Sequence, residues 1–167
     1  MNVTALRSEW CRRLGVHPKT KRCVIEFIKA LITYRFFQAI IENPITVPVK
    51  VSDKSSLDEL VSKAKRAKRD PVTFINYLLE SGDPVARAIK DWIVNARIVA
   101  LTDGATASIV EDIALSRRDL HMRGVVKASV RELTMMRRRD VDSFLKYALD
   151  VVEFFNTTKA KTTNANV

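Results

Sequence analysis

The chain has 167 residues, of which 47% are hydrophobic, so it is long enough for one domain with a sizeable apolar core. Its four glycines and five prolines are few, which argues against a turn-rich β-sandwich and favours long helices. The 29 Lys and Arg against 19 Asp and Glu give a formal net charge of +10, and this surplus indicates a polyanionic partner, nucleic acid before membrane.

The first part of the chain predicts two helices joined by a tight corner. Residues 4–14 form a short helix that ends at Gly15, because glycine favours the left-handed backbone that terminates helices. Pro18 opens a much longer helix, in which apolar residues recur at steps of three and four. Asn43 and Pro44 stop this second helix.

The second helix is apolar around most of its circumference. Such a helix is buried on several sides or against a second subunit, so we expect segment 23–41 to contact a copy of the chain or another protein. Glu26 and Lys29 interrupt the segment, which is too polar to span a membrane. Residues 44–54 then predict an extended strap, since Pro44 and Pro48 are incompatible with a central strand.

The rest of the chain predicts a series of helices separated by capping residues. Ser56 and Glu59 form a capping box, and Asp-Pro pairs place an N-cap before a proline at the first helical position. The expected helices run from Ser56 to about Arg69, from Pro71 to Gly82, over 84–101, over 106–123 with Gly124 as the stop, over 125–138, and from Asp140 to about Phe155.

These elements predict an all-α fold, a multi-helix bundle with an N-terminal helical arm and an extended strap. We divide the chain into a basic helical arm plus extended connector (residues 1–54), a helical bundle (55–156) and a flexible tail (157–167), because the last residues lack apolar periodicity.

Lysines and arginines gather in three parts of the chain, where they are suited to bind phosphate groups. No exposed aromatic residues alternate with them, so contact with the backbone of a duplex is favoured over base stacking. A solvated helix end for residues 63–69, and a membrane or protein contact for the amphipathic helix 125–138, are the alternatives. The candidate nucleic-acid contacts are Arg12, Arg13, Lys19, Lys21, Arg22, Lys63, Lys65, Arg66, Lys68, Arg69, Arg117, Arg118, Lys127, Arg131 and Arg138.

Residues 9–25 could form a helix-turn-helix with Gly15 at its corner. In these positions the stretch resembles the helix-turn-helix of small bacterial and archaeal regulators, and the resemblance implies that Thr20 and Arg22 face DNA. It departs from that pattern at Lys21, where the motif requires a buried Val or Ile. A phosphate-contacting arm that does not read sequence is the other interpretation of this stretch.

The sequence contains no motif for catalysis or for a cofactor. It lacks a glycine-rich phosphate loop and a Gly-x-Ser-x-Gly elbow, so we expect no enzyme activity and no cofactor. Cys11, His17 and Cys23, with His121 as a distant fourth ligand, could bind zinc, but close cysteine pairs are usual for structural zinc, so ordinary buried thiols are favoured. Two cysteines and no signal peptide favour a reducing compartment.

The leading hypothesis is a non-enzymatic structural protein that assembles on the phosphate backbone of nucleic acid, most simply a viral helical capsid or nucleocapsid protein that packages DNA. In general style, small, basic and all-helical with an arm ahead of a bundle, the chain resembles the coat proteins of filamentous archaeal viruses. This hypothesis places it in a virion or in the host-cell cytoplasm. A dimeric helix-turn-helix regulator and a helical adaptor for an acidic protein partner are the alternatives.

Overall fold

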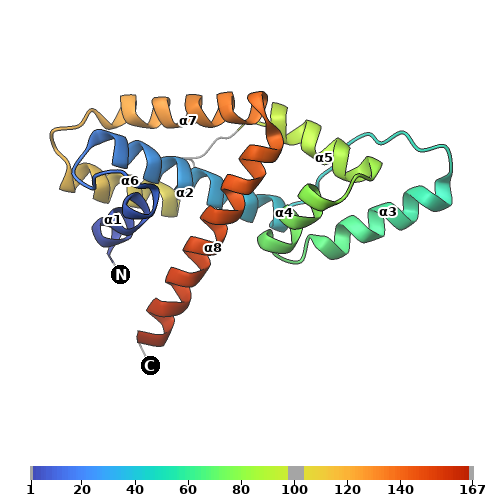
Figure 1. The fold of residues 1–167 in the computed structure, drawn as a ribbon, viewed down its shortest axis with the longest axis horizontal. Helices are drawn as coiled ribbons and strands as arrows, with labels where there is room; N and C mark the ends of the chain where they lie inside the picture. The colour runs from blue at the N-terminus through green and yellow to red at the C-terminus, as the bar shows by residue number, and fades with distance from the viewer. Residues whose placement is uncertain (1, 98–103, 166–167) are drawn as a thin grey trace.

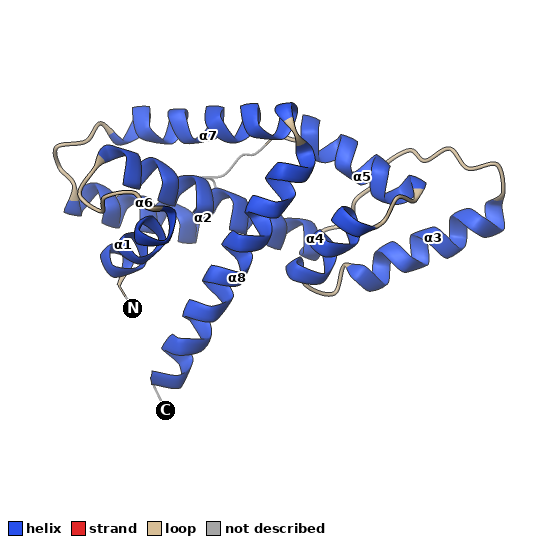
Figure 2. Cartoon of the chain, in the orientation of Figure 1, coloured by secondary structure: helices blue, strands red, loops and turns tan. Residues whose placement is uncertain are grey.

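The computed structural model describes residues 2–97 and 104–165, and this part of the chain is an all-α multi-helix bundle without strands (Figures 1 and 2). Its helices are α1 (Val3–Leu14), α2 (Lys21–Glu42), α3 (Lys54–Ala67), α4 (Pro71–Glu80), α5 (Pro84–Asn95), α6 (Gly104–Ser116), α7 (Met122–Arg139) and α8 (Val141–Ala165).

The corner at Gly15 is confirmed. Gly15 has a φ of 73°, in the left-handed region, and its N–H donates to the carbonyl of Arg12. The N–H of Val16 donates to the carbonyl of Cys11 at 2.8 Å, which completes a Schellman motif. The chain therefore reverses within a few residues and lays the start of α2 beside the end of α1 (Figure 1).

Two predicted helix starts are corrected by their caps. The N-cap of α2 is Thr20, whose hydroxyl accepts a hydrogen bond from the Cys23 N–H at 3.2 Å, so Pro18 lies in the turn before the helix. α3 begins before the expected capping box, because the Asp53 carboxylate accepts from the N–H of Ser55 and from the hydroxyl of Ser56, both at 3.1 Å. An acidic side chain at an N-cap is stabilised by the positive end of the helix dipole.

The two Asp-Pro starts are confirmed. Asp70 accepts from the N–H of Thr73, and Asp83 accepts from the N–H of Ala86, each at 2.8 Å. α4 ends at Glu80 before Gly82, and α5 ends at Asn95, short of the expected residue 101. At this end the buried guanidinium of Arg137 donates to the carbonyl of Ile93 in the last turn and to that of Ala96, at 2.9 Å, just after the helix, and so caps α5 from the side.

The predicted helix 106–123 was wrong at its C-terminal end. α6 ends at Ser116, and α7 begins at Met122 with His121 as its N-cap, whose Nδ1 accepts from the Gly124 N–H at 3.3 Å. Gly124 therefore lies in the first turn of a helix and does not terminate one. At the other end of the chain, α8 continues past the expected Phe155 to Ala165, while the division of the chain into domains stays a prediction.

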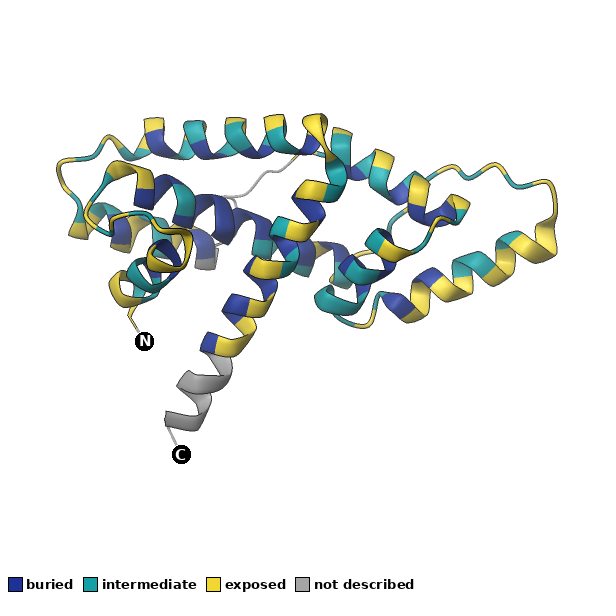
Figure 3. Cartoon of the chain, viewed as in Figure 1, coloured by how far each residue is buried: buried dark blue, intermediate teal, exposed yellow. Residues whose placement is uncertain are grey.

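α2 lies at the centre of the core, with α1, α4, α6, α7 and α8 packed around it (Figures 1 and 3). Every residue from Cys23 to Thr33 except Glu26 is buried. Residues 1–54 are predicted as an arm ahead of the bundle, and in the structure α2 of this segment packs against α4, α6, α7 and α8, because an apolar helix needs cover on nearly every side and the later helices supply it. None of the described helices has the length and apolarity needed to cross a bilayer.

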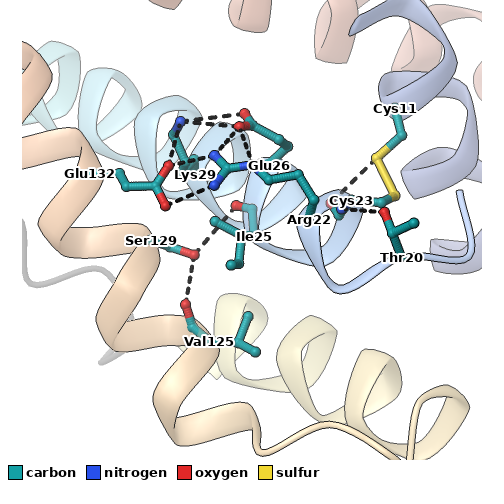
Figure 4. Close-up of polar contacts among 10 residues, drawn as sticks. All are labelled: Cys11, Thr20, Arg22, Cys23, Ile25, Glu26, Lys29, Val125, Ser129 and Glu132. Carbon is teal, nitrogen blue, oxygen red and sulfur yellow. Dashed lines mark hydrogen bonds and ion pairs between the residues drawn. A yellow bond between two sulfur atoms is a disulfide. The ribbon is translucent and has the colours of Figure 1, made fainter. Parts of the chain in front are cut away.

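Cys11 and Cys23 form a disulfide that joins α1 to α2 (Figure 4). Their Cα atoms lie 5.6 Å apart, within the usual range for a disulfide, because the tight corner brings the two helix ends together. The interpretation of these residues as ordinary buried thiols was therefore wrong. Disulfides persist in oxidising surroundings, so the expectation of a reducing compartment loses the argument on which it rested.

A group of four charged residues joins α2 to α7 (Figure 4). Arg22 donates to Glu26 at 3.0 Å and to Glu132 of α7 at 3.0 Å. The buried Lys29 contacts both carboxylates, at 3.4 Å and 3.3 Å. Two cations thus neutralise two carboxylates at the edge of the core, which satisfies the charges that interrupt the apolar surface of α2.

We expect the disulfide to stabilise the folded state. The Cys11→Ala/Cys23→Ala double variant should lower the free energy of unfolding by about 2–3 kcal/mol, because the bond closes a short loop and restricts the unfolded chain. Equilibrium urea unfolding of the oxidised protein, the reduced protein and the variant measures this. Equal midpoints for all three, with complete reduction verified by thiol titration, would contradict the expectation.

The α2–α7 ion group should make stability depend on acid pH. The hydrogen bond from Arg22 and the charge of Lys29 hold the pKa of Glu132 below its ordinary value of 4.5, against the opposing effect of partial burial. Glu132 therefore contributes stability above pH 4.5 that is lost as the pH falls through its lowered folded-state pKa. At neutral pH, Glu132→Gln should cost about 1–3 kcal/mol. The difference from the wild type should shrink on acidification in urea titrations; a difference independent of pH would rule out this role.

Candidate functional site

A cationic cleft of about 700 Å³ lies where α1, the α1–α2 turn and the residue after α6 meet. No acidic side chain lines it within the described part of the chain. Its lining consists of four cations, Arg7, Arg12, Lys19 and Arg117, and of Thr4, Ser8, His17 and Pro18. We refer to this surface as the N-terminal cleft.

Arg7 is the buried member of the N-terminal cleft. Together with Trp10 and Cys11 it forms the inward face of α1, at the spacing of three and four residues that places side chains on one side of a helix. Its exposed fraction is 5%, although α1 carries other arginines that are open to solvent. The sequence analysis missed Arg7, and its position one turn before Trp10 was the signal that it faces inward.

The guanidinium of Arg7 has no anionic partner among the described residues. Its Nε and Nη1 atoms are buried and make no hydrogen bond with any described residue. Burial lowers the pKa of Arg7, and the nearby positive charge of Arg117 lowers it further. A buried donor without an acceptor costs about 1–3 kcal/mol, and more when it is charged, so this arrangement is unfavourable in the absence of an anion.

Arg117 approaches Arg7 from the loop that follows α6. Its Nε and Nη2 donate to the two carboxylate oxygens of Asp119, each at 3.1 Å, and this pair raises the pKa of Arg117. The side chain is thereby fixed in direction. Its third nitrogen, Nη1, is buried and makes no hydrogen bond with any described residue.

The α1–α2 turn fixes Lys19 at the rim of the cleft. The Nδ1 atom of His17 accepts a hydrogen bond from the Lys19 N–H at 3.1 Å, and the Thr20 hydroxyl donates to the His17 carbonyl at 2.8 Å. The disulfide joins Cys11, before this turn, to Cys23, after it, and so holds the backbone on the α1 and α2 sides of the cleft together.

The predicted contact residues fall into separate groups in the structure. Arg12, Lys19 and Arg117 come together in the N-terminal cleft. The cluster over residues 63–69 belongs to α3 and the loop after it, far from α1 and α6 (Figure 1). The residues Lys127, Arg131 and Arg138 are exposed along α7. The fold therefore does not gather all three sequence clusters into one surface.

Several predicted contacts are bound within the protein. Lys63 pairs with Asp83 at 3.7 Å, and Arg69 pairs with Asp70 at 3.2 Å. Lys68 donates to the backbone carbonyl of Asn43, the residue after α2. The exposed candidates that make no hydrogen bond or ion pair through their side chains with the described residues are Arg12, Arg13, Lys19, Lys21, Lys65, Arg66, Arg118, Lys127, Arg131 and Arg138.

The helix-turn-helix interpretation assigns base contacts to two residues that have partners in the protein. The hydroxyl of Thr20 caps α2, and the guanidinium of Arg22 is shared by Glu26 and Glu132 (Figure 4). Lys21 is exposed, whereas the helix-turn-helix motif has a buried residue at this position. The second helix of the pair is also the most central helix of the bundle, where its length is covered by other helices.

The proposed zinc ligands are not assembled into a metal site. The disulfide leaves neither Cys11 nor Cys23 as a thiolate, and the Nδ1 atoms of His17 and His121 accept backbone hydrogen bonds. Among the described residues, no group of three or more His, Cys, Asp or Glu side chains is placed to hold a metal ion.

No protein-family model, curated protein or solved structure matches this chain.

Arg22 should act on stability through its carboxylate partners. Arg22→Met should lower the free energy of unfolding by about 1–2 kcal/mol, because Glu132 and Glu26 lose their principal donor. Lys21→Met, at the exposed neighbouring position, is the matched control and should change stability by less than about 0.5 kcal/mol. Urea unfolding compares the two variants. Equal losses in the free energy of unfolding of the two variants would show that the ion pairs of Arg22 do not contribute to stability.

Proposed function

We propose that the protein binds the phosphate backbone of nucleic acid without reading sequence and is a non-enzymatic structural protein. The form of this function that we favour is a coat protein of a helical viral capsid or nucleocapsid that packages duplex DNA. The observation that supports it is the convergence of Arg7, Arg12, Lys19 and Arg117 on one cleft, whose lining among the described residues includes no acidic side chain. Such convergence of positive charge attracts a polyanion.

Exposed aromatic side chains would be expected of a protein that stacks on single-stranded bases. The large hydrophobic side chains that are exposed in the described part of the chain are Leu14, Leu115 and Met135. Trp10 and Phe27 are buried in the core. We therefore propose that the protein contacts the phosphate backbone of a duplex and does not stack on its bases.

Assembly of many copies along the nucleic acid is part of this proposal. Segment 23–41 of α2 was the expected contact between subunits, but the chain itself covers most of it. The exposed Ala39 and partly exposed side chains such as Phe36 and Ile41 remain available there. The exposed cations on α7 add charge that would favour assembly on a polyanion over assembly of the protein alone.

Charge reversal at the rim of the cleft tests the proposal. The Arg12→Glu/Lys19→Glu variant should bind every duplex more weakly, and the slope of log affinity against log salt should fall by roughly 0.9 for each lost phosphate contact. Lys50→Glu/Lys146→Glu makes the same change in net charge at exposed residues outside the candidate set, and should retain most of the affinity. Fluorescence anisotropy with several unrelated duplexes measures both variants.

The result separates the coat proposal from its alternatives. Negative-stain microscopy of the wild type with duplex DNA should show filaments of uniform width. Loss of affinity for one sequence alone would support a regulator instead. No duplex binding at physiological salt would leave the adaptor for an acidic protein partner as the better explanation.

A further inference from the structure

We propose that Arg7 and Arg117 form a discrete binding site for a single phosphate group at the base of the N-terminal cleft. This site rests on the proposed function only for the identity of its ligand. If the protein binds nucleic acid, the phosphate group is a phosphodiester of its backbone. A phosphate group on a small molecule is the other source of the same chemistry.

The unpartnered donors of Arg7 are the first observation behind the site. More than nine-tenths of this residue is buried, yet two of its nitrogens make no hydrogen bond with the described residues. Most buried polar groups in folded proteins are hydrogen-bonded, and a buried charge without a partner is rarer still. An uncharged residue of similar length would fill the same space without this cost. The position thus fits an anion better than it fits a role in packing.

A second arginine with a free donor faces the same cleft. Asp119 occupies two nitrogens of Arg117 and sets the direction of its guanidinium, while the buried Nη1 keeps no partner among the described residues. Arg7 and Arg117 are near enough to repel each other electrostatically. Two cations from separate elements, α1 and the loop after α6, that line the same cleft are suited to share one anion between them.

The chemistry of the lining favours a phosphate group. Planar guanidinium groups match the oxygens of phosphate, and the hydroxyls of Thr4 and Ser8 line the same cleft as further donors. The exposed Arg12 and Lys19 add positive charge at the rim, so the cleft carries more positive charge than a single carboxylate would neutralise. A cleft of about 700 Å³ is much larger than a single ion, so the phosphate would belong to a larger molecule that extends outward past the rim.

Thermal unfolding in phosphate and in chloride tests the site on the full-length, oxidised protein. At matched ionic strength, inorganic phosphate should raise the melting temperature of the wild type above its value in chloride. Arg7→Met should reduce this increase to the general stabilisation that a kosmotropic anion gives any folded protein, and its affinity for phosphate in calorimetric titration should fall roughly tenfold or more. Arg123→Met removes an exposed arginine outside the cleft and should respond to phosphate like the wild type.

The melting temperature in chloride alone provides an independent check. Removal of a buried, unpaired charge should leave Arg7→Met as stable as the wild type or more stable, whereas loss of an ordinary core contact would lower its melting temperature. Arg117→Gln is a second variant that should show the same reduced response to phosphate. A rise in melting temperature with phosphate that is as large in Arg7→Met as in the wild type overturns the site.

Competition experiments then distinguish the sources of the phosphate group. If the group belongs to nucleic acid, inorganic phosphate should displace a short duplex at constant ionic strength, and Arg7→Met should weaken duplex binding. If Arg7→Met loses phosphate but binds the duplex unchanged, the site stands and its ligand is a small phosphate compound. If the wild type binds no duplex while phosphate still stabilises it through Arg7, the proposed function fails and the site stands.

Two further outcomes count against the site alone. Duplex binding by the wild type, with no response to phosphate and no effect of Arg7→Met, overturns the site and leaves the proposed function standing. An oligo-glutamate peptide that binds through Arg7, where inorganic phosphate does not bind, also overturns it, because the anion would then be a carboxylate of an acidic protein.

Discussion

The fold depends on the burial of α2. This helix is apolar on nearly every side, and the chain satisfies it by packing α1, α4, α6, α7 and α8 around it. The arrangement leaves Glu26 and Lys29 at the edge of the core, where unpaired charges would be costly. Arg22 and Glu132 neutralise them across the seam with α7, so the same contacts that satisfy the charges also fix the position of α7.

The cations that give the chain its high charge consequently have different roles. Some are fixed within the protein: Arg22 and Lys29 pair with carboxylates, while Lys68 and Arg137 bind carbonyls near helix ends. Others are exposed and unpaired, and these are the ones that can attract a polyanion over a distance. Arg7 belongs to neither group, since it is buried and two of its nitrogens have no acceptor among the described residues. This exception is what distinguishes the N-terminal cleft from the other basic surfaces.

The rigidity of the cleft bears on the function that we propose. The disulfide and the Schellman corner hold the backbone of α1 and of the turn in place, and the Asp119 pair orients the side chain of Arg117. A site of this kind would place one phosphate group in a defined position on each copy of the protein. Repetition of the same contact along a duplex would give regular assembly with no dependence on base sequence, because the phosphates recur at constant spacing.

The sequence by itself determined the all-α class, the Gly15 corner and the Asp-Pro helix starts, because these features depend on local backbone preferences. It also identified Arg12, Lys19 and Arg117 as cations, but it could not show that they meet. Only the tertiary structure decided that Cys11 bonds to Cys23, that Arg22 is bound to Glu132, and that two buried nitrogens of Arg7 find no hydrogen-bond partner among the described residues. These outcomes depend on contacts between segments far apart in the chain or on which face of a helix is covered, and no local pattern of residues encodes them.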